Sequence, residues 1–246
     1  MKLIKSLITH HSSLMKYYII AGEASGDLHA SNLMKAILQK DHNSEFRFWG
    51  GDLMEKVANQ KPVKHYKELA FMGFLEVAMN IRTILKNIKL CKEDIKNYQP
   101  DVLVLVDYPG FNLRIAEFAK SIGIKVVYYI SPQLWAWKEG RVETIKKYVE
   151  EMLVILPFEK DFYKKHQVNA HFVGHPLLDA ISDLAPIDAE NFKKENGLND
   201  KEIIALLPGS REQEVEKMLS LMLSVRDYFK NYQFVIAGAP SLPKEF

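Results

Sequence analysis

The stretch that most constrains the fold is residues 102–114, VLVLVDYPGFNLR. Its five leading apolar residues predict a strand buried on both faces, as in a parallel sheet covered by helices. Asp107 follows where this strand ends, and Pro109 and Gly110 then predict a sharp turn. Because open α/β sheets bind ligands at the carboxyl ends of their strands, Asp107 is a candidate functional carboxylate. The alternative is an aspartate that only caps the turn.

Short apolar runs alternate with helical stretches along the chain, which predicts an α/β protein with a parallel sheet. Polar residues 182–199 interrupt this pattern, and a second strand–loop–helix–strand unit follows them. We expect a disordered extension over residues 1–14, a first domain over 15–181, a linker over 182–199 and an incomplete second domain over 200–246. Strands are expected at residues 17–21, 46–49, 102–106, 124–130, 152–156, 171–173, 202–206 and 233–237, with helices at 28–39, 70–92, 113–121 and 212–230.

The composition is that of an ordinary globular protein, with 48% hydrophobic and 26% charged residues. A net charge of +2 without a Lys/Arg cluster argues against a nucleic-acid partner. The single cysteine, Cys91, indicates a reducing compartment. No apolar run approaches the ~20 residues of a membrane-spanning helix. These features predict a cytoplasmic protein.

A glycine-punctuated loop, GEASGD, follows the first predicted strand and opens a helix. Its glycines and serine free backbone N–H groups at a helix N-terminus, which suits an anion. The loop lacks the spacing of a dinucleotide fingerprint and the lysine of a Walker A motif, so a plain tight turn is the alternative. Asp52 is expected to cap the next short helix. The candidate binding residues of this loop are Gly22, Glu23, Ser25, Gly26 and Asp27.

The loop SPQLWAW, residues 131–137, places two tryptophans within three residues. Trp135 and Trp137 either plug the core or line a ligand cleft, where their rings suit sugars or acyl chains. Further along, His175 lies in a Gly-His-Pro turn. It is either an acid/base or ligand-facing residue or, as the pattern alone favours, a turn histidine satisfied by backbone.

The sequence LPGSR, residues 207–211, lies between a predicted strand and a helix. Gly209 and Ser210 expose amide donors, and the guanidinium of Arg211 offers a fixed fork of donors. This combination predicts an anion site suited to a diphosphate.

The segment from Ala70 to Lys92 is rich in Phe and Met and carries a stripe of basic residues. Such a segment suits an anionic membrane surface. A core helix with a solvated basic edge is the alternative, and the pattern alone favours it.

Seven motifs, in this order, resemble those of lipid-A-disaccharide synthases, which are glycosyltransferases of the GT-B fold. The resemblance implies a GT-B-like α/β architecture, with a Rossmann-type parallel-sheet domain followed by the start of a second one. The motifs are AGEASGDLH (21–29), MGFLEV (72–77), DYPGFNLR (107–114), YYISPQLWAWKEGR (128–141), LPFEKDFY (156–163), FVGHPLLD (172–179) and LPGSREQEV (207–215).

The resemblance implies transfer of 2,3-diacylglucosamine from UDP-2,3-diacylglucosamine to 2,3-diacylglucosamine 1-phosphate (lipid X), with inversion, giving lipid A disaccharide 1-phosphate and UDP. Asp107 matches the expected base. Arg211 with Gly209 and Ser210 would hold the diphosphate, without a metal or other cofactor. Glu23, Ser25 and Asp27 would line the cleft. The remaining substrate-binding candidates are Asn112, Ser131, Trp135, Trp137, Arg141 and His175.

The chain departs from the family pattern at three places, namely at Gly110, at Ala30, where members often have a glycine, and at the C-terminal end. Many members have a second aspartate where this chain has Gly110, so that residue cannot be the base here. A further glycine/threonine/glutamate loop for the nucleotide is absent from the 246 residues, so the chain resembles a member truncated in its C-terminal domain.

The resemblance also shifts the expected partners and location. Because both substrates carry acyl chains, residues 70–92 are expected to contact the inner face of the cytoplasmic membrane peripherally; a homo-oligomer is left open. Two alternatives stand beside the transferase. One is another GT-B transferase or a sugar-nucleotide epimerase, and the other is a non-catalytic, lipid-binding remnant.

Overall fold

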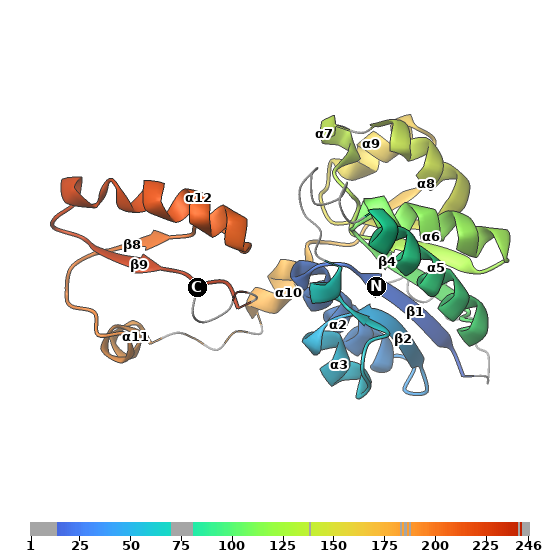
Figure 1. Cartoon of the computed structure of the whole chain (residues 1–246), viewed down its shortest axis with the longest axis horizontal. Helices are drawn as coiled ribbons and strands as arrows, with labels where there is room; N and C mark the ends of the chain where they lie inside the picture. Colours follow the sequence, from blue (N-terminus) through green and yellow to red (C-terminus); the bar gives the residue numbers. More distant parts are fainter. Residues whose placement is uncertain are drawn as a thin grey trace. The chain divides into compact units, whose positions relative to one another are not determined.

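The computed structural model describes residues 14–69, 81–137, 139–182, 184, 186, 188–240 and 242. The chain divides into two compact units, Met1–Ile181 and Ser182–Phe246, each considered by itself (Figure 1).

Unit 1 is built on a seven-stranded sheet in which every paired strand is parallel to its neighbour. The strand order is β3-β2-β1-β4-β5-β6-β7, so β4, the strand before Asp107, lies at the centre. The strands are β1 (Lys16–Ala21), β2 (Glu45–Gly50), β3 (Lys64–His65), β4 (Val102–Val106), β5 (Lys125–Tyr129), β6 (Glu151–Val154) and β7 (Ala170–Phe172).

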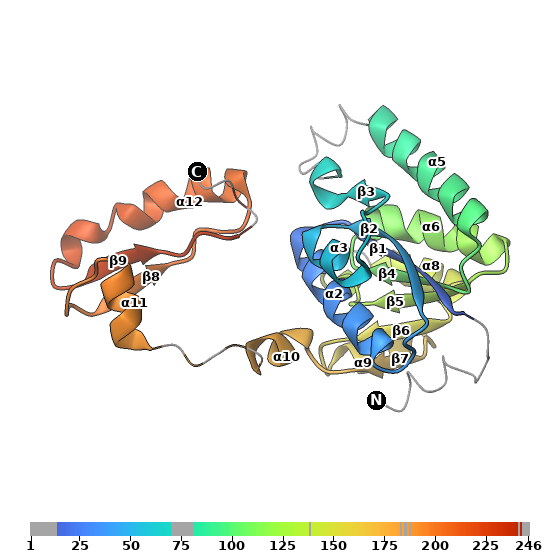
Figure 2. The ribbon, with the colours of Figure 1, turned by 90° about the horizontal axis from the view of Figure 1, so that it is seen from below.

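Helices cover both faces of this sheet (Figure 2). The three valines of β4 join a core cluster with α2 and α3, and its two leucines join a second cluster with α5, α6, α8 and α9. Alternate residues of β4 therefore enter opposite cores, which explains why this strand is apolar throughout. The helices are α2 (Ala24–Leu38), α3 (Asp52–Ala58), η1 (Tyr66–Glu68), α5 (Ile81–Tyr98), α6 (Pro109–Ser121), α7 (Leu134–Trp137), η2 (Glu139–Arg141), α8 (Val142–Tyr148), α9 (Glu159–Lys165) and α10 (Pro176–Ser182).

Unit 2 contains a parallel pair of strands, β8 (Ile203–Leu206) and β9 (Gln233–Ile236). They are connected through α12 (Glu212–Leu223) and η3 (Arg226–Tyr228), and α11 (Ala189–Glu195) precedes them. Helix α11 lies within the stretch expected to be a linker. Helix α12 ends seven residues before the predicted end at residue 230, and a 3₁₀ turn follows it.

Several helices begin earlier than the sequence predicts. Helix α6 begins at Pro109 rather than residue 113, because proline is favoured in a first turn. Helix α2 begins at Ala24, so part of the predicted GEASGD loop is helical. Residues 134–137, also predicted to be loop, form α7. The prediction that Asp52 caps α3 is wrong: the N-cap is Gly51, and Asp52 is the first helical residue.

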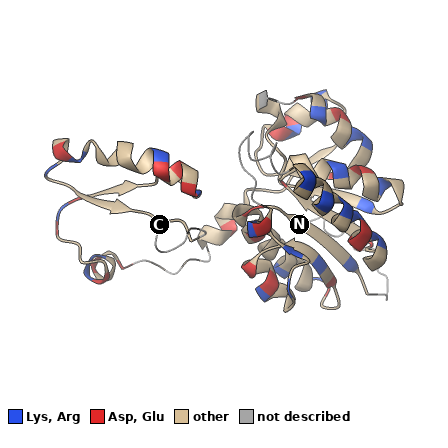
Figure 3. Cartoon of the chain, in the orientation of Figure 1, with Lys and Arg blue, Asp and Glu red and all other residues tan. Residues whose placement is uncertain are grey.

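The proposed membrane segment lies only partly within the described residues, because residues 70–80 are outside them. Its remainder opens α5, which buries Ile88 and Cys91 against the sheet. The other side of the helix exposes Leu85 and Leu90, and basic residues recur along it (Figure 3). None of the helices in the described part of the chain is long and apolar enough to cross a membrane.

A polar network joins α5 to the sheet. The carboxylate of Asp94 accepts two hydrogen bonds from Arg47, at 2.7 and 2.6 Å, and one from the hydroxyl of Tyr18 at 2.7 Å. That hydroxyl accepts a hydrogen bond from the indole of buried Trp49 at 2.8 Å. Asp94 therefore provides the acceptor for the buried hydroxyl of Tyr18, where an unpaired donor is costly.

We predict that Asp94→Ala lowers the free energy of unfolding of unit 1 by about 2–3 kcal/mol, because charged hydrogen bonds are lost and a buried hydroxyl loses its acceptor. Glu93→Ala, at the neighbouring and exposed position of α5, is the control and should cost less than about 0.5 kcal/mol. Urea unfolding followed by tryptophan fluorescence measures both, since all three tryptophans lie in unit 1. Equal losses would contradict the assignment.

Candidate functional site

The candidate site lies at the carboxyl ends of the central strands of unit 1. Asp107 and Tyr108, directly after β4, have φ values of 42° and 49°, and Ile130, directly after β5, has a φ of 64°. These are left-handed conformations, which non-glycine residues adopt at a cost of about 1–3 kcal/mol each. Such conformations persist only where surrounding contacts hold them.

Buried donors hold the backbone of Asp107. Its carbonyl accepts hydrogen bonds from the hydroxyl of Tyr128 at 2.6 Å and from the amide of Asn112 at 2.7 Å. The same amide donates to the carbonyl of Val106 at 3.2 Å, and Asn112 is completely buried. Asn112, which the sequence analysis places among the residues that bind substrate, is therefore a buried residue that holds the backbone of Asp107 in place.

The ring of Tyr108 fixes the other side of this turn. It stacks on Phe111, with ring centroids 5.7 Å apart, and covers Gly22. A Cβ at Gly22 would lie 2.4 Å from Cδ1 of Tyr108, so only glycine fits there. Gly26 packs closely on β1, where an added Cβ would lie 3.2 Å from the Cβ of Ala21. Both glycines of the first loop thus serve close packing in this structure.

The carboxyl of Asp107 is accessible to solvent, and its pKa is higher than that of an ordinary aspartate. Partial burial and the nearby negative charge of Glu23 raise its pKa to about 6, while a backbone hydrogen bond opposes this rise. Such a carboxylate is still mainly ionised at pH 7 but is more basic than an ordinary aspartate. It can therefore take a proton from a hydroxyl.

Asp27 is placed differently from the expectation that it lines the cleft. It is 2% exposed, and its carboxylate accepts hydrogen bonds from the backbone N–H groups of Gly51 (2.8 Å), Leu53 (3.0 Å) and Met54 (3.1 Å). It thus caps α3, the role predicted for Asp52. Glu23 and Ser25 of the same loop remain accessible to solvent.

The SPQLWAW segment rests on a buried polar group. The hydroxyl of Ser131 donates to the carbonyl of Pro132 and lies 2.7 Å from the hydroxyl of Tyr163. Buried Glu159 accepts backbone hydrogen bonds at 3.2 and 2.9 Å; its side chain also bonds Ser131 and Trp135. Burial raises the pKa of Glu159, and these hydrogen bonds oppose the rise. Ser131 is therefore a buried support of the segment.

The two tryptophans lie on α7, and His175 directly precedes α10. The ring of Trp135 is 40% exposed and meets Phe158 edge-on at 5.0 Å, while the side chain of Trp137 is outside the described residues. His175 accepts a backbone hydrogen bond from Leu177 at 3.3 Å. Burial of His29 lowers the pKa of that residue, and its electrostatic interaction with His175 lowers it further.

In unit 2, the predicted anion loop is occupied by a carboxylate from its own chain. Glu214 accepts hydrogen bonds from the backbone of Ser210 and the guanidinium of Arg211, both at 3.1 Å. Gly209 has a φ of 131°, and a Cβ there would lie 2.7 Å from Glu214. Donors of this loop thus meet a carboxylate of the same helix turn, and the diphosphate site that the sequence predicts here stays a prediction.

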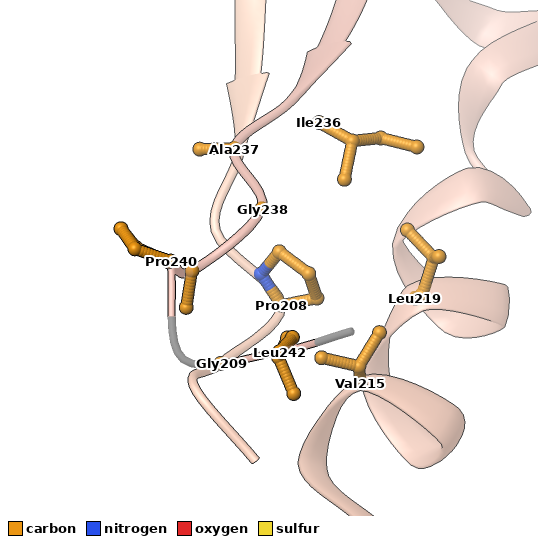
Figure 4. Close-up of a pocket in the computed structure, with 10 residues that line it drawn as sticks. Pro208, Gly209, Val215, Leu219, Ile236, Ala237, Gly238, Pro240 and Leu242 are labelled. Atoms are coloured by element: carbon orange, nitrogen blue, oxygen red, sulfur yellow. The ribbon is translucent and has the colours of Figure 1, made fainter. Parts of the chain in front are cut away.

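A cavity of about 480 Å³ lies beside this loop in unit 2 (Figure 4). Figure 4 shows Pro208, Val215 and Leu219 on one part of its lining and the segment after β9 on another. The cavity lies at the carboxyl ends of β8 and β9, where α/β folds bind ligands. In the part of the chain that the structure describes, no group of three or more His, Cys, Asp and Glu side chains is placed to hold a metal.

Sequence reasoning missed the supporting residues of this site. Tyr128 and Glu159 act through a backbone carbonyl and a buried hydroxyl; each lies inside a motif quoted above, but nothing in the sequence singled it out as a candidate. Tyr108 lies inside the DYPG motif, but its φ is visible only in the structure.

Solved structures define the fold class. A UDP-N-acetylglucosamine 2-epimerase from Methanocaldococcus jannaschii, solved with UDP-GlcNAc and UDP, aligns with a TM-score of 0.62 at 17% identity, covering 92% of this chain and 67% of that one. The S. aureus MnaA–UDP structure aligns with a TM-score of 0.63 at 13% identity, covering 92% and 62%. At such identities the likeness shows the fold alone, and it confirms the predicted GT-B-like α/β class.

The sequence defines the family. The family model described as lipid-A-disaccharide synthetase matches residues 17–242, and the chain belongs to this family. A lipid-A-disaccharide synthase from Geobacter metallireducens is 41% identical over 229 residues, which cover 91% of this chain and 59% of that protein. The synthase from Syntrophus aciditrophicus is 43% identical over 206 residues, covering 83% and 53%. The chain thus spans a little over half the length of these relatives.

We predict that Asp27→Ala lowers the free energy of unfolding of unit 1 by about 2–3 kcal/mol, because three backbone donors lose a charged acceptor. Asp52→Ala on the same helix is the control, since it removes only an exposed first-turn charge worth less than about 1 kcal/mol. Thermal unfolding of the two variants measures the difference. A larger loss from Asp52→Ala would restore the sequence-based assignment of the cap.

Proposed function

We propose that this chain takes part in a glycosyl transfer of lipid A biosynthesis, and that its unit 1 carries the acceptor and the base. The reaction joins 2,3-diacylglucosamine from its UDP carrier to the 6-hydroxyl of 2,3-diacylglucosamine 1-phosphate. Family membership supports the reaction class, and the relatives' name supports the product. The observation that carries the proposal is Asp107, a solvent-accessible carboxyl with a raised pKa at the end of the central strand.

The proposed chemistry is a direct displacement with inversion. Asp107 takes the proton of the acceptor's 6-hydroxyl as that oxygen attacks the anomeric carbon of the donor. The bond from the anomeric carbon to the diphosphate oxygen breaks, and UDP leaves with the electron pair. Arg211 and the amides at Gly209 and Ser210 stabilise the negative charge on the leaving group. In this proposal the diphosphate displaces the carboxylate of Glu214 from these donors when it binds.

The remaining candidates have supporting parts in the proposal. Unit 1 takes the lipid acceptor, with Trp135 and Trp137 beside its sugar or acyl chains, and Glu23, Ser25 and His175 near the base. Unit 2 takes the UDP-sugar. Exposed Leu85 and Leu90 among the basic residues of α5 support a peripheral contact with the cytoplasmic face of the membrane.

A sugar-nucleotide epimerase is the second candidate, because the solved neighbours named above include UDP-N-acetylglucosamine 2-epimerases. These neighbours share 12–17% identity with the chain, against about 40% for the synthases. Incubation with UDP-GlcNAc alone separates the candidates, since only an epimerase converts it to its 2-epimer.

We predict that Asp107→Asn lowers turnover by roughly 10²-fold or more and leaves UDP binding unchanged. Because the ionised carboxylate is the active form, kcat/KM of the unmodified enzyme should rise with pH through about 6 and then level off. The assay uses this chain joined to the C-terminal remainder of the Geobacter metallireducens relative, with that intact relative as the positive control. Full turnover in Asp107→Asn would remove the proposed base, and no disaccharide from the joined chain would contradict the proposed function.

A further inference from the structure

A second groove in unit 1 lies beside the proposed base. It has a volume of about 260 Å³, below the ~300–1,000 Å³ of pockets that enclose drug-sized ligands, so it suits a compact group. Pro109 and Gly110, which follow Asp107 and Tyr108, form part of its lining. The other lining residues are Leu113, Arg114, Glu117, Arg141 and Thr144.

Two guanidinium groups from separate elements line this groove. Arg114 lies on α6 and Arg141 ends η2. The guanidinium of Arg114 donates to the carbonyl of Gly110, which holds it over the first turn of α6. Within the described part of the chain, neither arginine forms an ion pair with a carboxylate.

The groove also has one carboxylate in its lining, that of Glu117. Glu117 accepts a hydrogen bond from the hydroxyl of Tyr148 at 2.9 Å. The first turn of α6, at Pro109 and Gly110, adds the positive end of a 13-residue helix. Two guanidiniums outnumber the single carboxylate, and with a hydroxyl at Thr144 and a helix N-terminus they offer donors that suit a phosphate group.

The groove also lies close to the turn that carries Asp107. Burial raises the pKa of Tyr128, and the positive charge of Arg141 opposes this rise, so the guanidinium lies within electrostatic reach of that hydroxyl. The same hydroxyl donates to the carbonyl of Asp107 at 2.6 Å. A ligand held by Arg141 is therefore close to the turn that carries Asp107.

We propose that Arg114 and Arg141 bind the phosphate monoester of the acceptor sugar and so present its hydroxyl to Asp107. The inference rests on the proposed function, because it gives the acceptor's phosphate a site separate from the diphosphate loop at Arg211. Arg114 and Arg141 are thus specificity-determining residues: they select an acceptor that carries a phosphate. An anionic lipid headgroup has the same chemistry and is the alternative source of the phosphate.

The test measures binding of lipid X, and of the same lipid without its phosphate, to the 246-residue chain in neutral detergent micelles by calorimetry. Lipid X should bind about tenfold or more tightly than the dephosphorylated lipid. Arg114→Gln and Arg141→Gln should remove this preference. Lys56→Gln, at an exposed cation on the opposite face of the sheet, should keep it. Circular dichroism confirms that each variant is folded.

The outcomes separate this inference from the proposed function. If both lipids bind equally well, or the arginine variants keep the preference, the phosphate site is wrong while the transfer proposal stands. If neither lipid binds, the proposed acceptor is wrong. If phosphatidylglycerol vesicles bind the unmodified chain and lose binding in the arginine variants, while lipid X binding is unchanged, the groove serves a headgroup and the inference is overturned. In the joined chain used for turnover, we expect Arg141→Gln to raise the acceptor's KM and to leave the donor's KM unchanged.

Discussion

The turn after β4 is the constraint on which the rest of the site depends. Two successive non-glycine residues, Asp107 and Tyr108, adopt left-handed conformations that an isolated chain would avoid. Hydrogen bonds from Tyr128 and Asn112 to the Asp107 carbonyl, and the ring of Tyr108 over Gly22, compensate for this strain. The β4 strand can supply this rigid base because both its faces are buried. The carboxyl that results is accessible, fixed in place and more basic than usual.

The sequence predicts the architecture well because its signals are local and repeated. The order of apolar runs anticipates the strands, and the VLVLV run identifies the centre of the sheet. Helix starts are less well predicted, as at α2 and α6, because polar and glycine-rich first turns read as loops. The strand β3 and the helix α11 were missed, since β3 is only the two polar residues Lys64 and His65, and α11 is a seven-residue, mostly polar helix that shows little apolar periodicity.

The roles of the candidate site residues stay predictions, and the sequence supports some of them better than others. Asp107 and Arg211 follow from where a carboxylate or a guanidinium stands relative to a strand end. The roles of Asp27 and Asn112 could not be read in the same way, because both bond backbone groups that folding brings to them. Loop composition shows which donors are available, but tertiary packing decides whether a side chain meets substrate or supports its neighbour. Arg114 was likewise no candidate until the fold placed it beside Arg141.

The central claim, that the turn after β4 prepares Asp107 as a base, is tested most directly by the pKa of its carboxyl. Carbon-13 NMR of protein labelled at aspartate carboxyls, with Asp107→Asn used for assignment, measures it in the unmodified chain and in Glu23→Gln. The account predicts a pKa of about 6 in the unmodified chain and a lower value when the charge at Glu23 is removed. A value near the ordinary ~3.9 of aspartate, unchanged in Glu23→Gln, would contradict it.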